Sequence, residues 1–363
     1  MVKVQDIYNF IDEIAPFDTA MDFDNVGMLV GNMNQEVAKV LLALDITPDV
    51  VNEAKTIGAQ LVLSHHPVIF NPIKSLDTSN AVYMLASNDI SAICAHTNLD
   101  MAPFGVNTCL AGALKLCNLE PLSIYRQKNY YKVSVFVPED SSEKVSKAMT
   151  NAGAGILGDY CDCTFSVQGK GTFTPLDGAN PFIGNVNKHE VVDEKRIEMI
   201  CSPKNLDKVI RAMKETHPYE EPAFDVFENL AIKDRDVCGL IGDLSKGMTC
   251  DEFAIFVKDA LDCNGLRYIK GNRSIKKVAV CSGAGGDLVF NAIRLKADAY
   301  VTGEIKHHEL LAARQAGLTV VDATHFCTED VVITPLIERL SDKFKNVSFT
   351  KSSVLKDNFI YIN

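Results

Sequence analysis

The sequence LVLSHHPVIF at residues 61–70 is the stretch around which we interpret the rest of the chain. It opens with an apolar run that is too short for a membrane span and leads directly into two histidines and a proline. This pattern predicts a buried β-strand that ends at the histidines. Because Pro67 turns the backbone, the side chains of His65 and His66 can face one site, although neighbouring residues within a strand point to opposite faces.

Histidines are rare in this sequence and gather after strand-like runs. Of the eight histidines in 363 residues, six belong to four such runs. In an open α/β sheet the loops after the carboxyl ends of the strands converge on one crevice, so these histidines are expected to meet there. Histidine beside carboxylate indicates a metal site. The four runs are AQLVLSHH, ISAICAHTNLD, ADAYVTGEIKHHE and LTVVDATHFCTE, and the histidines are His65, His66, His96, His307, His308 and His325.

The composition is that of an ordinary globular protein, because 47% of the residues are hydrophobic and 23% are charged. A length of 363 residues is enough for two or three domains. The net charge of −11 disfavours binding to a nucleic-acid backbone, because no basic stripe offsets it. The eleven cysteines are odd in number, and residues 1–16 lack the features of a secretion signal. We therefore expect a cytoplasmic protein with reduced cysteines. We expect no transmembrane helix, since no apolar run approaches ~18 residues.

Strand-like and helix-like segments alternate through both outer parts of the chain, at spacings near ~30 residues per strand–helix–strand unit. This alternation predicts an α/β fold with mostly parallel sheets between layers of helices. We expect two lobes of this kind, at residues 1–124 and 233–363. The last long helix is expected at residues 328–344, with His325 and Glu329 at its start.

Residues 125–232 differ from the rest in composition, with stretches rich in glycine, proline and threonine such as CTFSVQGKGTFTPLDGANPFIG. The expected order is strand, helix, strand-rich loops, strand, helix, strand. Two strand–helix–strand halves of this kind form a ferredoxin-like α+β domain. We expect this domain to interrupt the two-lobed core, and its roughly 110 residues are within the usual size of a domain.

Two carboxylates accompany the histidines. Asp100 lies four residues after His96, in an expected loop, and a carboxylate there can bridge two cations, which a neutral imidazole cannot do. His325 and Glu329 are four residues apart at a helix start, a spacing that places both on one face. The alternatives are structural, because Asp100 can cap a helix near Gly105 and Glu329 can simply favour a helix amino terminus.

Three imidazoles and two carboxylates form the ligand set expected for a pair of divalent ions, with the carboxylates between them. Mixed nitrogen and oxygen ligation favours zinc, with iron or manganese as alternatives, over magnesium or calcium. The competing interpretation of the histidine doublet is a pair of partly exposed loop residues. The predicted metal ligands are His65, His66, Asp100, His325 and Glu329.

Other polar residues near the predicted crevice are candidates for catalysis. His96, Glu304 and His307 can orient the ligands through hydrogen bonds or act in acid–base chemistry, and an ordinary hydrogen-bonded loop residue is the alternative for each. His307 and His308 begin a helix, where adjacent residues point ~100° apart, so at most one of them is expected to face the crevice. The stretch CSGAGGD at residues 281–287 can cradle a phosphate or form a tight turn, and both interpretations stay open.

Five motifs together resemble the NGG-interacting-factor-three family, whose bacterial members are commonly named GTP cyclohydrolase 1 type 2 homologues. The motifs are DNVGMLVG, SHHPVIF, HTNLD, TGEIKHHE and THFCTE, and the resemblance covers the chain nearly end to end. It implies a two-lobed α/β fold, a toroidal homohexamer and a dinuclear metal centre in each subunit. The middle segment, which contains HPYEEPAFD, resembles the extra domain of longer members, a domain related in fold to PII-like and CutA-like modules. By motif, the implied metal ligands are again His65, His66, Asp100, His325 and Glu329.

We therefore expect a dinuclear metal hydrolase. Two divalent cations lower the pKa of a shared water toward ~7 and so supply hydroxide at neutral pH. The family name suggests GTP as the substrate, and another nucleotide or phosphoester fits the same ligands. The alternative from a different class is a non-catalytic, metal-dependent regulatory protein, scaffold or metal carrier, because PII-like domains usually bind ligands and oligomerise.

Overall fold

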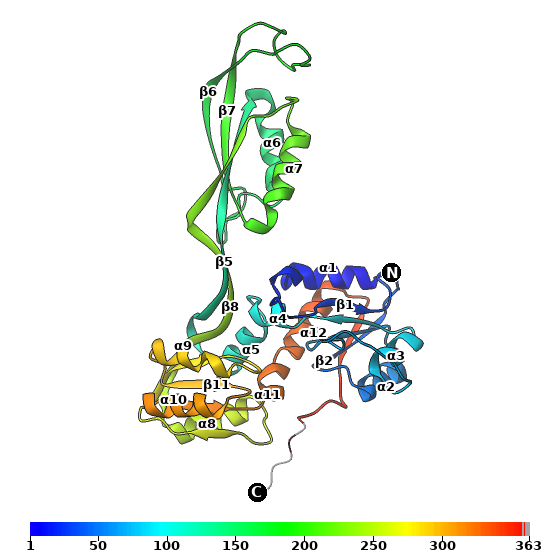
Figure 1. The fold of residues 1–363 in the computed structure, drawn as a ribbon, viewed down its shortest axis with the longest axis vertical. Helices are drawn as coiled ribbons and strands as arrows, with labels where there is room; N and C mark the ends of the chain where they lie inside the picture. Colours follow the sequence, from blue (N-terminus) through cyan, green and yellow to red (C-terminus); the bar gives the residue numbers. More distant parts are fainter. Residues whose placement is uncertain (358, 360–363) are drawn as a thin grey trace. The chain divides into compact units, whose positions relative to one another are not determined.

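The computed structural model describes residues 1–357 and residue 359, which form two compact units. Unit 1 comprises Met1–Tyr125 and Asp236–Asn363, and unit 2 comprises Arg126–Arg235. Figure 1 gives the order of the elements along the chain. Each helix in the described residues is too short or too polar to cross a membrane.

The amino-terminal lobe of unit 1 is built on a five-stranded sheet in the order β1-β4-β3-β2-β13. Strands β4, β3, β2 and β13 run parallel, and β1 pairs antiparallel with β4. β13 comes from the far end of the chain and pairs with β2 (Figure 1). The residues of the other lobe lie between these two strands in the sequence. The strands are β1 (Gly27–Val30), β2 (Lys39–Ala43), β3 (Leu61–Ser64), β4 (Ser91–Cys94) and β13 (Ser348–Lys351).

Apolar side chains of this sheet alternate between its two faces, as the two-residue period of a strand requires. In β3, Leu61 and Leu63 pack in the core that includes α1 and α12, whereas Val62 packs in the core that includes α2 and α3. Helices therefore cover both faces of the sheet. The helices are α1 (Val4–Ile14), α2 (Pro48–Ile57), α3 (Ala81–Ser87), α4 (Thr97–Met101), α5 (Val106–Ala113) and α12 (Ile333–Lys343), with the 3-10 turn η1 (Phe17–Thr19).

The carboxy-terminal lobe of unit 1 contains strands in the order β8-β10-β11-β12-β9, of which β8 contributes residues 236–248 to this unit. β10, β11 and β12 run parallel, while β8 and β9 pair antiparallel with β10 and β12. In β10, Val278 and Val280 face one core and Ala279 faces the other. The elements are β8 (Phe224–Met248), α8 (Cys250–Ala260), β9 (Arg267–Ile269), β10 (Ile275–Val280), η4 (Gly286–Leu288), α9 (Val289–Arg294), β11 (Ala299–Thr302), α10 (His307–Ala316), β12 (Thr319–Asp322) and α11 (His325–Asp330).

The predicted α/β class is confirmed, and parallel strands form the middle of both lobes, but two local predictions are wrong. The segment expected as one helix at residues 328–344 is divided between α11 and α12. Pro335 lies inside the expected helix, where a proline has no N–H to donate to the carbonyl four residues before it and its ring clashes with that carbonyl. That carbonyl belongs to Val331, which lies between the two helices. The expected loop at HTNLD contains the short helix α4.

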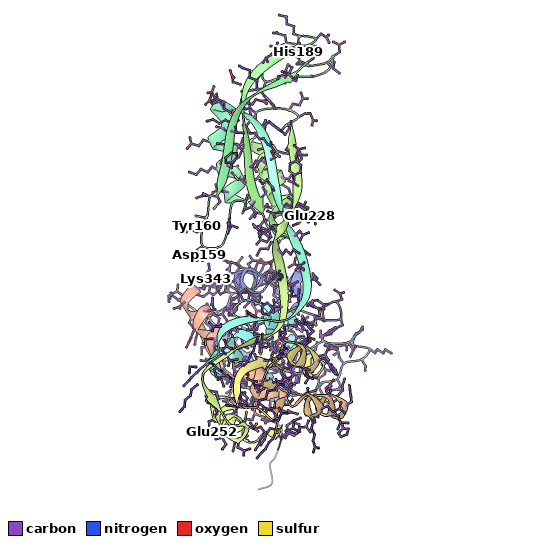
Figure 2. The ribbon with its side chains drawn as sticks, turned by 90° about the vertical axis from the view of Figure 1, so that its left-hand side faces the viewer. Asp159, Tyr160, His189, Glu228, Glu252 and Lys343 are labelled. Atoms are coloured by element: carbon purple, nitrogen blue, oxygen red, sulfur yellow. The ribbon has the colours of Figure 1, made fainter. Side chains whose placement is uncertain are left out.

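Unit 2 has the element order β5, α6, β6, β7, α7, β8, and its strands follow the sheet order β6-β7-β5-β8. β7 pairs antiparallel with both β5 and β6. This βαββαβ order is that of the ferredoxin-like arrangement. Figure 2 places His189, just before β7, at one end of the unit and Glu228, on β8, toward the other. The remaining bounds are β5 (Cys117–Pro138), η2 (Glu139–Ser141), α6 (Ser142–Asn151), β6 (Thr164–Phe173), β7 (Glu190–Cys201), η3 (Pro203–Asn205) and α7 (Leu206–Thr216).

The two helices of unit 2 cover one face of its sheet. Val133, Val135 and Val137 of β5 are fully buried there against Val145 of α6 and Val209 of α7. The intervening residues of β5 point to the other face, as strand alternation requires. That second face is free of α6 and α7, and it contains Phe136.

Candidate metal centre

Neighbouring parallel strands of the amino-terminal lobe each deliver a polar residue to the centre. β2, β3 and β4 lie side by side, and Asp45, His65 and His96 follow their carboxyl ends. Because the carboxyl ends of parallel strands meet at one edge of a sheet, these side chains converge. The ring centroids of His65 and His66 are 5.0 Å apart, so both histidines of the doublet contribute to the same site.

The carboxy-terminal lobe supplies the opposite side of the centre in the same way. Ser282 follows β10, Glu304 follows β11 and His325 follows β12. The Ser282 hydroxyl donates a hydrogen bond of 3.2 Å to Asp100 Oδ1, which joins the two lobes at the centre. The site therefore lies where the carboxyl ends of the parallel strands of the two lobes face each other.

The Glu329 carboxylate is at the middle of the cluster and is only 3% exposed. Its Oε1 lies 3.1 Å from His325 Nε2 and 3.7 Å from His65 Nε2, and its Oε2 lies 2.9 Å from His66 Nε2. His65 Nε2 is also 3.7 Å from Asp100 Oδ1. The structure thus brings the predicted ligands of the two lobes together in one cluster.

Each imidazole of the cluster is held through its other ring nitrogen. Carbonyl and carboxylate oxygens only accept, so the ring nitrogen facing them carries a proton and donates it. In a neutral ring the Nε2 lone pair is then free, and metal-ligating histidines in proteins are oriented in this way. The four bonds run from His65 Nδ1 to Ala95 O (2.9 Å), from His66 Nδ1 to Asp45 Oδ1 (2.8 Å), from His96 Nδ1 to Asp24 Oδ1 (2.9 Å) and from His325 Nδ1 to Glu304 Oε1 (2.7 Å).

Two buried atoms of the cluster, His65 Nε2 and Glu329 Oε2, have no hydrogen-bond partner among the described residues. His66 Nε2 lies 2.9 Å from Glu329 Oε2, but the two groups are not aligned for a hydrogen bond. Buried polar atoms are nearly always paired, so these atoms require another partner. A cation satisfies both, because it binds an imidazole lone pair and a carboxylate oxygen equally well. The donor set therefore fits a metal ion.

The ligand atoms form groups that are compact enough for a single ion. His66, His325 and Glu329 form one group, and His65, Asp100 and Glu329 form another, with the ligand atoms of each within 4.8 Å of one another. Ligands of a tetrahedral cation at about 2.0–2.2 Å lie roughly 3.3–3.6 Å apart, and the Glu329 oxygens lie 2.9, 3.1 and 3.7 Å from Nε2 of His66, His325 and His65. Glu329 belongs to both groups, whereas Asp100 belongs only to the second.

His96 completes a third group with His65 and His66. Its ring centroid lies 5.1 Å from that of His65 and 5.4 Å from that of His66. Burial alone would raise the pKa of Asp24, but hydrogen bonds from His96 and Thr97 lower this pKa to about 2. Asp24 is therefore ionised at neutral pH and keeps the His96 Nδ1 proton in place.

The carboxylates of the centre favour positive charge at the imidazoles. Burial alone would lower the pKa of His66, but Asp45 and Glu329 raise it to about 10. Burial alone would also lower the pKa of His325, but Glu329 and Glu304 raise it to about 9. Burial alone would raise the pKa of Glu329, but the surrounding imidazoles hold it well below its usual value. This is the electrostatic environment that a cation requires, and a bound cation would compete with these protons.

The other candidate residues from the sequence differ in their distance from the ligand groups. Glu304 is exposed and accepts the Nδ1–H of His325, whereas His307 and His308 are exposed at the start of α10 and belong to none of the ligand groups found among residues 1–357 and 359. Asp100 does not cap the next helix, because Gly105 is the N-cap of α5 and no side chain caps it.

Asp24 and Asp45 contribute to the centre and were not predicted, and Ser282, which also contributes, belongs to the CSGAGGD stretch that was expected as a phosphate cradle or a tight turn. Asp45 and Ser282 follow the carboxyl ends of strands, as His65 does, and this position was the available signal for both. Next to Ser282, Gly283 has a φ of +58°, and a Cβ there would lie 2.1 Å from Glu329 Oε1. A glycine is therefore required for the CSGAGGD loop to approach the Glu329 carboxylate.

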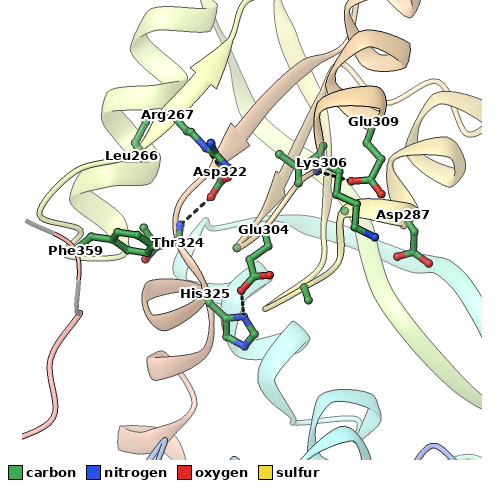
Figure 3. Close-up of a pocket in the computed structure, with 14 residues that line it drawn as sticks. Leu266, Arg267, Asp287, Glu304, Lys306, Glu309, Asp322, Thr324, His325 and Phe359 are labelled. Carbon is green, nitrogen blue, oxygen red and sulfur yellow. Dashed lines mark hydrogen bonds and ion pairs between the residues drawn. The ribbon is translucent and has the colours of Figure 1, made fainter. Parts of the chain in front are cut away.

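A cavity of about 850 Å³ borders the centre. His325 and Glu304 lie at its edge, joined by their hydrogen bond, and the side chains of Lys306 and Arg267 also line it (Figure 3). Arg267 is held by Asp322, with distances of 2.7 and 2.8 Å from Nη2 and Nε to Oδ2. The volume is within the range of small-molecule sites in proteins.

The fold and the cluster define a class of protein, in which two α/β lobes hold a histidine–carboxylate centre that can bind a metal ion between their strand ends. The sequence profile of Duf34/NIF3 (NGG1p interacting factor 3) matches residues 2–358, and the chain belongs to this family. The resemblance inferred from the sequence motifs is therefore confirmed.

Known proteins resemble the chain over almost its whole length. A protein of Bacillus subtilis (strain 168) named GTP cyclohydrolase 1 type 2 homolog is 38% identical over 370 residues, covering 99% of each chain. The crystal structure of a Bacillus cereus protein related to NIF3 matches with a TM-score of 0.90 at 38% identity, covering 99% of both chains. A Staphylococcus aureus crystal structure matches with a TM-score of 0.79 at 32% identity, again covering 99% of both chains.

Proposed function

We propose that this protein is a metal-dependent hydrolase that binds two divalent cations in the cluster around Glu329. The observation that carries this proposal is the position of Glu329, whose carboxylate belongs to two separate groups of ligand atoms. A carboxylate has two oxygens and can bind two cations at once, which a neutral imidazole cannot do. His65 and Asp100 would hold one ion with Glu329, and His66 and His325 would hold the other.

Zinc suits this donor set best, because imidazole and carboxylate ligands are typical of zinc sites, and iron or manganese are the alternatives. A pair of such ions supplies Lewis acidity and lowers the pKa of a coordinated water toward ~7. The chain's own contribution is to fix the ligands. Asp45, Asp24 and Glu304 keep the Nδ1 protons of His66, His96 and His325 in place, so that the Nε2 atoms face the centre.

The cavity beside His325 is the proposed substrate site. Asp287, Glu304, Glu309 and Asp322 line it together with Lys306 and Arg267, so the positive charge that would favour an anionic substrate has to come from the two cations at its edge. The cavity volume of about 850 Å³ suits a nucleotide, and the names of the relatives suggest GTP. Hydrolytic opening of the guanine ring would then release formate and leave a pyrimidine product.

The test is to load the purified protein with zinc, iron or manganese and to measure formate and pyrimidine release from GTP, together with a panel of other nucleotides. The proposal predicts turnover that depends on metal and disappears in His65→Ala. Turnover equal in the wild type and in His65→Ala would contradict it. Tight metal binding without hydrolysis of any nucleotide would instead favour a metal carrier or scaffold.

Three further expectations from the sequence belong to the same proposal. Unit 2 is proposed to be a ferredoxin-like domain inserted into the two-lobed core, and the functional assembly is proposed to be a toroidal homohexamer. A cytoplasmic location is supported by the cysteines, all of which are free.

A further inference from the structure

We propose that unit 2 contains a binding site for a small organic ammonium cation. The site is a cavity of about 410 Å³, formed only by residues of unit 2. It lies far along the chain from the metal ligands and has a different chemistry, with aromatic rings and glutamates in its walls. The lining residues on which the proposal rests are Phe136, Phe173, Phe182, Glu194, Tyr219 and Glu220.

The aromatic rings surround Tyr219. The Phe173 ring lies 5.9 Å from the Tyr219 ring at an interplanar angle of 61°, and the Phe182 ring lies 6.4 Å away at 53°. Rings that are tilted in this way present both faces and edges to the space between them. The face of an aromatic ring carries negative charge density and attracts ammonium groups, and protein sites for quaternary ammonium ions are built from several such rings.

A buried carboxylate lies in the same wall. Glu194 is 8% exposed, and its Oε1 accepts a hydrogen bond of 2.9 Å from the Tyr219 hydroxyl. The neighbouring strand approaches Glu194 closely, because Gly171 has no side chain, and a Cβ there would lie 2.1 Å from Glu194 Oε2. A buried carboxylate is costly unless it is paired with positive charge, so this position is unusual for a glutamate.

The protein itself supplies no cation to Glu194 within the described residues. No lysine or arginine there forms an ion pair with it, and none lines the cavity. Arg196 lies 5.9 Å from the Phe136 ring centroid, but its guanidinium is 2.8 Å from the Glu198 carboxylate. The Arg196 guanidinium is therefore already paired with Glu198.

His217 lies close to Glu194 but is neutral. Its Nδ1 accepts the Tyr219 backbone N–H at 3.0 Å, so the proton is on Nε2, which donates to the Phe136 carbonyl at 2.9 Å. Both nitrogens are thus committed to the backbone. A ligand cation is the partner that the Glu194 carboxylate lacks.

The loop between β6 and β7 forms another wall of the cavity and brings Phe182 to it. Its two ends are joined by a contact of 3.3 Å between Thr174 Oγ1 and His189 Nδ1, and Figure 2 shows His189 at this end of the unit. The Asn180 backbone N–H donates to Glu220 Oε2 at 3.0 Å, which fixes the middle of the loop. Phe182 remains 61% exposed, so a ligand can reach its ring.

The carboxylates and the aromatic rings of the cavity together determine which class of ligand can bind. Glu194, Glu220 and Glu221 in the lining repel anions, and a neutral apolar ligand would leave the Glu194 carboxylate unpaired. The volume suits a compact molecule, such as one with a trimethylammonium head. A small organic cation satisfies both the carboxylate and the rings.

Isothermal titration calorimetry of the full-length protein tests this inference with choline and its uncharged carbon analogue, 3,3-dimethylbutan-1-ol, which has the same shape. We expect choline to bind at least about tenfold more tightly, because only the cation gains from the rings and the carboxylate. Equal affinity for the two compounds, or no heat of binding with choline, would overturn the proposal. His65→Ala should bind choline as the wild type does, because the site is independent of the metal centre.

Variants locate the site. Glu194→Gln keeps the shape and the Tyr219 hydrogen bond but removes the charge, and we expect about tenfold weaker choline binding. Phe182→Ala, at an exposed ring, should weaken binding without unfolding the unit, so it tests the site even if Glu194→Gln fails to fold. Phe165→Ala is the matched control, since Phe165 is a similarly exposed phenylalanine, at 64%, outside the cavity. Choline affinity that is unchanged in Phe182→Ala, or reduced equally in Phe165→Ala, would contradict the proposal.

Discussion

His325 donates from Nδ1 to Glu304 Oε1 at 2.7 Å, while its Nε2 lies 3.1 Å from Glu329 Oε1. One imidazole thus connects an exposed carboxylate at the edge of the cavity to the buried carboxylate at the middle of the cluster. The first bond fixes the tautomer, and the second contact identifies the atom that would bind a cation. The other three imidazoles of the cluster are held in the same way.

Glu304→Ala should weaken metal binding without unfolding the protein. The variant removes the acceptor of the His325 Nδ1–H, so the ring loses its fixed orientation, and losses of this kind are on the order of 10–100-fold in metal affinity. Competition with a chromophoric chelator measures the change. Glu338→Ala is a matched control, because Glu338 is also an exposed glutamate of unit 1 but lies on α12. Equal affinities for the two variants would show that the Glu304 bond does not orient a ligand.

Gly283→Ala should impair both stability and metal binding. The residue has a φ of +58°, and the new Cβ would lie 2.1 Å from Glu329 Oε1, so the carboxylate must move. An alanine in this backbone region costs about 1 kcal/mol or more in the free energy of unfolding. Thermal unfolding and metal titration together measure the two effects.

Gly58→Ala is the control that separates the loss of stability from the loss of metal binding in Gly283→Ala. Gly58 ends α2 with a φ of +69°, but a Cβ there meets no atom within 4 Å. This variant should therefore lose only the backbone contribution of about 1 kcal/mol, no more than Gly283→Ala loses, while its metal affinity stays at the wild-type value. If Gly283→Ala also keeps full metal affinity, the close approach of this loop to Glu329 has no role in binding.

Unit 2 should become less stable as the pH falls below about 6.5. Burial lowers the pKa of His217 in the folded protein, although the hydrogen bond to Phe136 and the charge of Glu194 oppose the shift. The unfolded chain therefore takes up the proton first, and folding stability is lost as the pH falls from the ordinary histidine pKa through the lower folded value. Hydrogen exchange of β5 and α7 at pH 7 and pH 5.5 measures this loss.

His217→Gln provides the comparison for that experiment. Glutamine can still donate to the Phe136 carbonyl but does not titrate, so protection of β5 should change less between the two pH values than in the wild type. An equal loss of protection in both proteins would assign the pH dependence to other groups.

The sequence was sufficient to predict that the candidate ligands of each lobe lie close together, because residues that follow parallel strands meet at one edge of a sheet. This rule applies to His65, His96 and His325, and it applies equally to Asp45, which we did not select. The pairing of His96 with Asp24 was not accessible in this way, because Asp24 does not follow a parallel strand but precedes β1, which pairs antiparallel with β4.

Helix geometry accounts for the remaining differences. Pro335 was present in the sequence, and its effect on the carbonyl of Val331 divides the last helical segment into α11 and α12. His307 and His308 also follow a strand, but α10 begins at His307 and both side chains are exposed. Which side of a helix faces a site depends on packing, and the spacing of histidines alone does not determine it.

The most direct test of the account is the number of metal ions bound per chain, measured by elemental analysis after metal loading and desalting. We predict two ions for the wild type, at most one for Asp100→Asn, and none for Glu329→Gln, because Glu329 belongs to both groups of ligand atoms and Asp100 to one. Two ions retained in Glu329→Gln, with the fold intact by circular dichroism, would contradict the claim that this carboxylate is shared.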